Sequence, residues 1–264
     1  MAKDVGNITQ SFSFLWTKLG ISGIIAKKMK GGNVVKRYHI AGLRVDMDVG
    51  GRTLVQAQPY EAESDGPADI KIRCNIDKVM EANPELGDRD MAEYMGTGTI
   101  FAHRIMMFDG FQLHSSAVML DGHAYLFSAP SGTGKSTHTE KWCRLFGARL
   151  LNDDKPVLRY QQDKWIAYGT PWSGKHDLSV PAGVPLGGIA FLRRGQENTI
   201  CRMEPGEAVI HLISQTPRYL TAEQMQLQLT LVDRLLQTVP VWLLTCRNDD
   251  EAAFVSYESM RCKA

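Results

Sequence analysis

Apolar positions in the middle of the chain follow a β-strand pattern and form two adjacent segments. Ser115–Leu120 and His123–Ser128 are apolar runs, and Asp121-Gly122 separates them. Asp-Gly between two such runs is a strong signal for a tight β-hairpin. Pairing the strands outward from this turn places His114 beside Ala129, the residue after the second strand. The pattern therefore predicts an antiparallel hairpin with a histidine next to the end of its second strand.

The segment after this hairpin changes from strand to loop and then to helix. Residues 128–137 read Ser-Ala-Pro-Ser-Gly-Thr-Gly-Lys-Ser-Thr, residues 137–146 have helical character, and Arg149–Asn152 is a short strand. A strand–helix–strand crossover makes its two strands parallel, so that their carboxyl ends meet at one edge of the sheet. We therefore expect Asp153-Asp154, which follows the second of these strands, to face the glycine-containing loop.

The loop has the composition of a phosphate-binding loop. Gly132 and Gly134 can adopt positive φ, which lets successive backbone N–H groups converge on an anion, and the following helix adds its N-terminal dipole. Lys135 can place its charge on the terminal phosphates, and the Ser136 hydroxyl can bind Mg²⁺. The expected cradle consists of Ser131, Gly132, Thr133, Gly134, Lys135, Ser136 and Thr137. The alternative is an ordinary corner whose glycines only cap the helix.

The loop departs from the usual phosphate-binding pattern at its start. That pattern opens with glycine, and Ala129 occupies the corresponding place here. Pro130 follows and has no backbone N–H, so one donor of the cradle is missing. The donors must then come from Ser131 to Ser136.

Asp153 and Asp154 are candidates for metal binding and proton transfer. Two adjacent acids at the ligand-binding edge of a sheet are costly unless a cation neutralises them, and Mg²⁺ fits that role. One acid can bind the metal while the other accepts a proton from an attacking hydroxyl. The alternative is a solvated turn in which an aspartate caps a helix.

A second hairpin is predicted from Pro156–Tyr160 and Lys164–Tyr168, with a turn at residues 161–163. Its pairing returns the loop Gly169–Lys175 to the acid pair. Ser173 and Lys175 are then candidates for contact with substrate or phosphate, although the loop could equally be a packing turn. Arg193, near the end of the predicted strand 189–194, is a further candidate for phosphate contact, against the alternative of a solvated rim.

The chain divides into three predicted parts. Residues 1–36 form an apolar and basic extension that suits either a membrane surface or, as we favour, docking onto the protein or onto a second copy. Residues 37–100 are predicted to be a β-rich subdomain. Its expected strands are 39–49 and 53–58, which form a hairpin around Gly50-Gly51, and 70–76. Residues 101–264 are predicted to be the catalytic domain. Further helices are expected at 91–108, 205–215, 221–237 and from Asp249, with a strand at 239–246. The fold class is therefore mixed α/β, with a mixed sheet flanked by helices.

Composition excludes several classes of protein. The chain has 264 residues and a net charge of +1, from 30 basic and 29 acidic side chains. That balance argues against a nucleic-acid-binding protein, which would carry a basic face. Five dispersed cysteines without a Cys-x-x-Cys pair favour free thiols in a reducing compartment. With no span-length apolar run and no signal peptide, we expect a cytoplasmic protein.

Three segments resemble the catalytic domain of HPr serine kinase, which shares its fold with phosphoenolpyruvate carboxykinase. They are Leu-His-Ser-Ser-Ala-Val (113–118), Ala-Pro-Ser-Gly-Thr-Gly-Lys-Ser-Thr (129–137) and Leu-Asn-Asp-Asp-Lys-Pro-Val-Leu (151–158). The resemblance implies that Lys135 and Ser136 bind phosphate and metal and that His114 contacts phosphate. It implies one catalytic base and one magnesium ligand in the acid pair, either Asp153 and Asp154 in that order or the reverse.

The resemblance implies an ATP- and Mg²⁺-dependent kinase that phosphorylates a hydroxyl on a peptide, a protein or a small metabolite. The carboxyl-side signature of HPr kinases is absent, which argues against HPr as the acceptor. Two alternatives stay open: a nucleotide-responsive binding module without catalysis, and a carboxykinase-like enzyme. Homo-oligomers fit any of these hypotheses.

Overall fold

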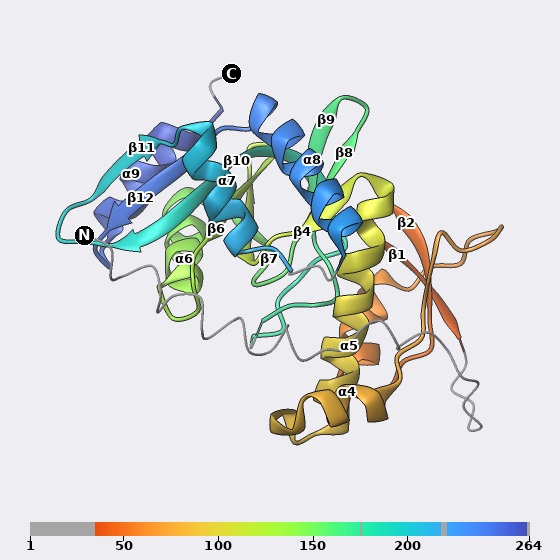
Figure 1. The fold of residues 1–264 in the computed structure, drawn as a ribbon. Coiled ribbons are helices and arrows are strands. Elements are labelled where there is room, and N and C mark those ends of the chain that lie inside the picture. The colour runs from red at the N-terminus through yellow and green to blue at the C-terminus, as the bar shows by residue number, and fades with distance from the viewer. Residues whose placement is uncertain (1–34, 175, 218–220, 263–264) are drawn as a thin grey trace.

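The computed structural model describes residues 35–174, 176–217 and 221–262 (Figure 1). Within these residues, a nine-stranded mixed sheet occupies most of the chain, and a separate three-stranded sheet lies near the amino terminus. Helices pack against the sheets, so the fold is mixed α/β, as the sequence predicts. The extension of residues 1–34, and with it the expectation of membrane or partner contact, lies outside the described residues.

The elements follow the chain in two groups. The amino-terminal group comprises β1 (Lys36–Ile40), β2 (Leu43–Met47), α3 (Gly51–Ala57), β3 (Ile70–Ile72), α4 (Ile76–Ala82) and α5 (Arg89–Arg104), with 3₁₀ turns η2 (Gln58–Tyr60), η3 (Pro84–Leu86) and η4 (Ile105–Phe108). The second group comprises β4 (Gly110–Gln112), β5 (Ser115–Leu120), β6 (His123–Ser128), α6 (Lys135–Phe146), β7 (Arg149–Asn152), β8 (Val157–Gln161), β9 (Lys164–Tyr168), β10 (Gly183–Arg194), β11 (Thr199–Arg202), α7 (Pro205–Ser214), α8 (Ala222–Thr238), β12 (Val241–Cys246) and α9 (Asp250–Met260).

The long strand β10 joins the two halves of the large sheet. The strand order is β4-β8-β9-β10-β6-β5-β7, and β12, which also pairs with β11, adds to β10. The start of β10 pairs with β9 in antiparallel fashion, and its later part pairs in parallel with both β6 and β12. The partners of β10 therefore change along its length, and the sheet curls where they change. The part of the sheet on the β9 side is antiparallel, and the part around β6 and β12 contains parallel pairs.

The central strand β6 is buried on both of its faces. Successive side chains of a strand point to opposite faces, and here Ala124 and Leu126 belong to a core that includes residues of α7 and α8. Tyr125 and Phe127 belong to a second core that includes Trp142 of α6 and residues of α9. The helices therefore hold the carboxyl end of β6, where the glycine-containing loop begins, between two packed layers.

The hairpins predicted at Asp121-Gly122 and at residues 161–163 are confirmed. In the first, β5 and β6 pair with Ser115 opposite Ser128 and Leu120 opposite His123, around a turn at Asp121-Gly122. Both turn residues have positive φ, as a two-residue hairpin of this type requires. In the second, β8 and β9 pair around residues 162–163, close to the predicted turn.

The amino-terminal region differs from the prediction of a β-rich subdomain. The predicted strand 39–49 is a hairpin that turns at Ala41-Gly42, both with positive φ. Alanine rarely adopts this conformation, so only Gly42, and not Ala41, indicates a turn in the sequence. The predicted strand 53–58 lies mostly in α3, whose N-cap is Gly50, so the hairpin predicted at Gly50-Gly51 is wrong. Thr53 and Ala57 are buried one helical turn apart in α3.

The same region contains α4 and most of α5 besides its three strands, so "β-rich" describes only part of it. The division at residue 100 stays a prediction, and α5 runs across that position. Among the described helices, none combines the length and the apolar character needed to cross a membrane.

We predict that Gly98→Ala in α5 destabilises the fold. A Cβ at Gly98 would lie 2.8 Å from Cδ1 of Trp172. Trp172 is fully buried, stacks on Phe101 and donates a hydrogen bond to Thr97. Because the indole cannot move aside, the free energy of unfolding should fall by about 1–3 kcal/mol, as measured by urea denaturation.

The matched control is Gly206→Ala in α7, where an added Cβ meets nothing within 4 Å. Alanine favours a helix over glycine by up to about 1 kcal/mol, so this variant should be as stable as the original protein or slightly more stable. Equal effects of the two substitutions would contradict the packing argument.

Candidate functional site

The loop between β6 and α6, residues 129–134, is called the glycine loop here. Gly132 has φ of +77° and Gly134 has φ of +123°. A Cβ at either position would meet nothing within 4 Å, so the backbone conformation rather than crowding requires glycine there. Gly134 is also the N-cap of α6 and contributes no side-chain hydrogen bond to the helix start. The loop therefore brings the first backbone amides of α6 to the edge of the sheet.

Lys135 lies at the first position of α6 and bends back toward the loop. Its Nζ donates a hydrogen bond of 2.9 Å to the carbonyl of Ala129, and the residue is only 8% exposed. Burial lowers the pKa of Lys135, while the charge of Asp154 acts in the opposite direction. The ammonium group of Lys135 therefore lies beside the first residue of the glycine loop, where the negative charge of Asp154 acts on it.

Asp153 and Asp154 lie at the same edge of the sheet as the glycine loop. β6 and β7 are both antiparallel to β5, which lies between them, so they are parallel to one another, as the crossover argument predicts. The buried Asn152 ends β7, and its Oδ1 accepts hydrogen bonds from the backbone N–H of Asp154 at 2.9 Å and of Lys155 at 2.7 Å. This turn, which the Asn152 side chain closes, sets the backbone conformation at Asp153 and Asp154.

The two carboxyl groups lie in different environments. Asp153 is buried, and its Oδ1 accepts a hydrogen bond of 2.5 Å from the backbone N–H of Gly174. Burial raises the pKa of Asp153, and the charge of Asp154 raises it further, in part offset by the hydrogen bond from Gly174. A Cβ at Gly174 would lie 3.1 Å from Asp153 Oδ2, so the loop at Gly174 closely covers this carboxyl group.

Asp154 is bound by His114, the histidine that the hairpin register places beside the glycine loop. His114 Nε2 lies 3.1 Å from Asp154 Oδ1, and His114 Nδ1 lies 2.9 Å from Oε1 of Gln215. Burial raises the pKa of Asp154, but the hydrogen bond from His114 and the charges of Lys155, His114 and Lys135 outweigh it, and the net pKa is lowered. Asp154 therefore keeps its negative charge more readily than Asp153.

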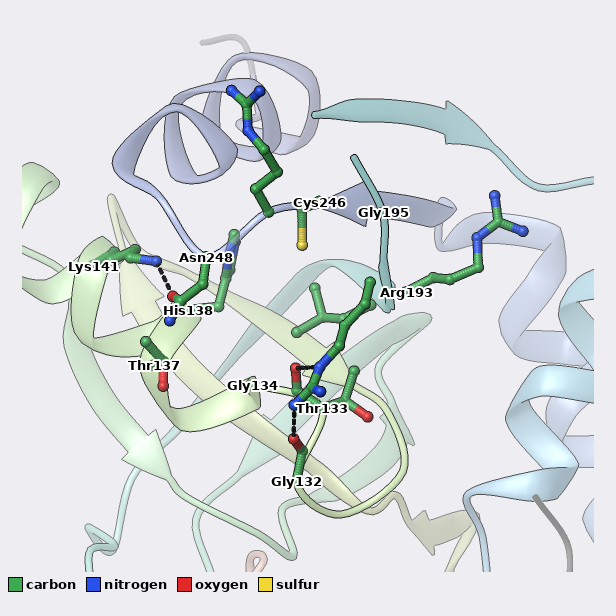
Figure 2. Close-up of a pocket in the computed structure, with 13 residues that line it drawn as sticks. Gly132, Thr133, Gly134, Thr137, His138, Lys141, Arg193, Gly195, Cys246 and Asn248 are labelled. Carbon is green, nitrogen blue, oxygen red and sulfur yellow. Dashed lines mark hydrogen bonds between the residues drawn. The ribbon is translucent and has the colours of Figure 1, made fainter. Parts of the chain in front are cut away.

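A pocket of about 500 Å³ opens beside the glycine loop (Figure 2). Its walls come from the loop, the first turns of α6 and the carboxyl ends of β10 and β12. The cationic side chains that line it are Lys141, Arg193, Arg194 and Arg247. Arg194 donates a hydrogen bond of 2.6 Å to the carbonyl of Gly132, so it supports the outer side of the loop. The pocket combines backbone amides with positive charge, a combination suited to an anionic ligand.

The remaining candidate residues lie in different places. Thr137 lines the pocket, and Ser131 is exposed at the tip of the glycine loop. Arg193 also lines the pocket, but it donates hydrogen bonds to Thr245 and its side chain extends away from the loop (Figure 2). Ser173 is buried, and its hydroxyl lies 3.4 Å from Gln56. Lys175 lies outside the described residues.

Sequence reasoning missed three residues near the acid pair. Gln215 follows α7 and holds His114, while Arg52 of α3 donates a hydrogen bond to the carbonyl of Gly174. Lys155 directly follows the acid pair, and this adjacency is the one sequence signal that could have found it. Arg52 and Gln215 are distant from the acid pair in sequence and follow no motif. Among the described residues, no group of three or more His, Cys, Asp or Glu side chains is arranged to hold a metal ion.

Comparison with known proteins gives a distant structural neighbour. No family model matches the chain, and no curated protein does. Among solved structures, the HPr(Ser) kinase/phosphatase from Coxiella burnetii is similar with 10% sequence identity and a TM-score of 0.34, over 56% of this chain and 94% of that chain. The resemblance noted in the sequence is thus matched only by a weak similarity of fold, which decides neither the activity nor the site.

Proposed function

We propose that this protein is a kinase that uses ATP and Mg²⁺ to phosphorylate a hydroxyl group. The observation that carries the proposal is the meeting of the glycine loop, Lys135 and the Asp153–Asp154 pair at one edge of the sheet. A glycine loop that opens a helix can bind phosphates. An adjacent acid pair can supply the metal ligand and the base that phosphoryl transfer also requires. The pocket beside the loop is large enough to take part of a nucleoside.

The residues present fit a magnesium nucleotide. Ser136 and Asp154 offer hydroxyl and carboxylate oxygens, the ligand type that Mg²⁺ prefers, and one or two such protein ligands are usual when phosphates complete the shell. In this proposal Lys135 and the amides from Ser131 to Thr137 hold the phosphates. The ion neutralises charge on the transferring phosphoryl group when it is bound.

The different environments of the two acids suggest which role each one has. Asp154, with its lowered pKa, stays ionised and suits the metal ligand. Asp153, with its raised pKa, is better matched to accepting a proton and suits the base. The acceptor oxygen would attack the terminal phosphorus as its proton passes to Asp153, and ADP would leave. His114 would orient Asp154 and face the phosphates.

This assignment predicts a bell-shaped dependence of kcat/KM on pH. Asp153 can accept a proton only when ionised, so activity should fall as the pH drops through a pKa above the ordinary aspartate value of about 3.9. Lys135 binds phosphate only when protonated, so activity should also fall as the pH rises through a pKa below about 10.4. Steady-state rates at low substrate report these groups in the free enzyme. An acidic limb at or below the ordinary aspartate pKa would contradict the role of Asp153.

The direct test is incubation with γ-labelled ATP, Mg²⁺ and a cell extract, followed by identification of the labelled species. The proposal expects a labelled hydroxyl compound, peptide or protein whose appearance requires both the enzyme and Mg²⁺. Nucleotide binding without any labelled product would favour the non-catalytic binding module. Consumption of ATP that depends on oxaloacetate would favour the carboxykinase-like alternative.

A further inference from the structure

Two cationic side chains beside the acid pair have no role in the function proposed so far. Arg52 comes from α3, in the amino-terminal region, and Lys155 directly follows the acid pair. Both lie near Tyr94 of α5: the guanidinium carbon of Arg52 is 4.3 Å from the centre of the ring, and Lys155 Nζ is 6.0 Å from it. The amino-terminal region thus brings positive charge to the acid pair.

Arg52 is tied to the loop that covers Asp153. Its Nη2 donates hydrogen bonds to the carbonyl of Gly174 at 3.0 Å and to Oδ1 of Asp177 at 2.5 Å. The N–H of the same Gly174 donates to Asp153. One residue therefore separates the guanidinium from the acid that we propose as the base. Within the described part of the chain, the buried Nε of Arg52 has no hydrogen-bond partner.

Lys155 has a fixed backbone and an ammonium group without an oxygen partner among the described residues. Its N–H is held by Asn152, and its carbonyl accepts a hydrogen bond from Thr170. Its Nζ contacts Sδ of Met95 at 3.8 Å, and sulfur is only a weak acceptor. Burial lowers the pKa of Lys155, while the charges of Asp154 and Asp153 raise it. A lysine ammonium normally forms strong hydrogen bonds, so the Nζ of Lys155 is suited to binding an anionic group.

We propose that Arg52 and Lys155 bind an anionic group of the phosphoryl acceptor, a carboxylate or a phosphate, and so present the acceptor's hydroxyl to Asp153. This inference rests on the proposed kinase function and names the class of its acceptor: a small hydroxyl compound with a negative charge close to the hydroxyl. Guanidinium and ammonium groups are the usual partners of both anions. The anionic group would occupy the side of the acid pair that faces Tyr94, and the nucleotide would occupy the glycine loop.

A purely structural role for the cations would be to offset the charges of the acid pair. Arg52 is already paired with Asp177. Lys155 forms no hydrogen bond with either acid, although it follows them directly in sequence. The charge of Lys155 does lower the pKa of Asp154, so it compensates part of the acid charge. The ammonium group of Lys155 nevertheless keeps N–H donors from which an external anion can accept hydrogen bonds.

The test measures anion binding and nucleotide binding separately. Full-length protein is saturated with a non-hydrolysable ATP analogue and Mg²⁺ and then titrated calorimetrically with glycerol 3-phosphate, with glycerate and with glycerol. We expect the two anionic probes to bind and glycerol not to bind, and the better anionic probe identifies phosphate or carboxylate as the preferred group. Arg52→Met and Lys155→Met should each weaken binding by about tenfold or more, as the loss of a charged hydrogen bond implies.

Matched variants control for charge and folding. Lys164→Met removes an exposed lysine at the far end of β9 and should leave anion binding unchanged. Arg52→Lys keeps a cation and should retain part of the affinity, while thermal melting by circular dichroism verifies that each variant is folded. The affinity for the ATP analogue should be the same in all variants.

Three results would overturn the inference: glycerol binding as well as the anionic probes, no binding of either anionic probe, or unchanged anion affinity in folded Arg52→Met and Lys155→Met. Failure of the unaltered protein to bind the ATP analogue would instead count against the proposed kinase function. The anion titration without nucleotide would still report on the cation pair in that case.

Discussion

Replacing Asp153 with asparagine is expected to lower kcat by about 10²- to 10⁴-fold, the usual contribution of a positioned general base. Asparagine keeps the shape of the side chain and can still accept the hydrogen bond from Gly174, but it cannot take up the proton of the acceptor. Binding of an ATP analogue, measured by calorimetry, should therefore be retained. Phosphoryl transfer is measured with γ-labelled ATP and the acceptor identified in the extract.

The control for this substitution is Asp163→Asn in the turn between β8 and β9, where the aspartate is exposed. This variant should transfer phosphate at the original rate. Full turnover by Asp153→Asn would assign the base elsewhere, and Asp154→Asn would be the next variant to measure, because the two acids are neighbours. Turnover retained in both variants would refute the proposed role of the acid pair in phosphoryl transfer.

Lys135→Met should weaken binding of the ATP analogue by about 10- to 100-fold, as expected when a hydrogen-bonded cation is lost from a phosphate site. Transfer should fall by a further factor of about 10²–10³, because Lys135 would also stabilise charge on the phosphoryl group in the transition state. Calorimetry measures the first effect, and γ-labelled ATP at saturating concentration measures the second.

Loss of folding does not explain the expected effect of Lys135→Met. Lys135 is buried, and burial lowers its pKa, so replacing its charge with an apolar side chain of similar length should leave the protein at least as stable. Lys71→Met, on the exposed side of β3, removes a lysine far from the loop in sequence and serves as the control. Equal nucleotide affinity in the two variants would show that the glycine loop does not bind phosphate as proposed.

Local sequence signals predicted the elements that carry the glycine loop. Asp121-Gly122 is a short-range turn signal, and a tight turn determines which residues pair along both strands. The position of His114 beside the loop follows from that register, and the parallel arrangement of β6 and β7 follows from the helical crossover that joins them. These features could be predicted because each depends on residues close together in the chain.

The same reasoning was wrong where burial, rather than local preference, determined the structure. Thr53 and its neighbours suit a strand, yet they form α3 because one helical face packs against the body of the protein. The turn at Ala41-Gly42 lacked the usual first residue and was missed for that reason. Tertiary contacts outweighed weak local preferences at both places.

The sequence by itself determined the glycine loop, the acid pair and the edge of the sheet that they share, because turn chemistry and crossover geometry act over short stretches of chain. Only the tertiary structure decided that Arg52, Lys155 and Tyr94 lie together beside Asp153, and that Gln215 holds His114. Arg52 and Gly174 are separated by 122 positions in the sequence. Contacts at such separations arise from the packing of the whole core, which no local pattern encodes.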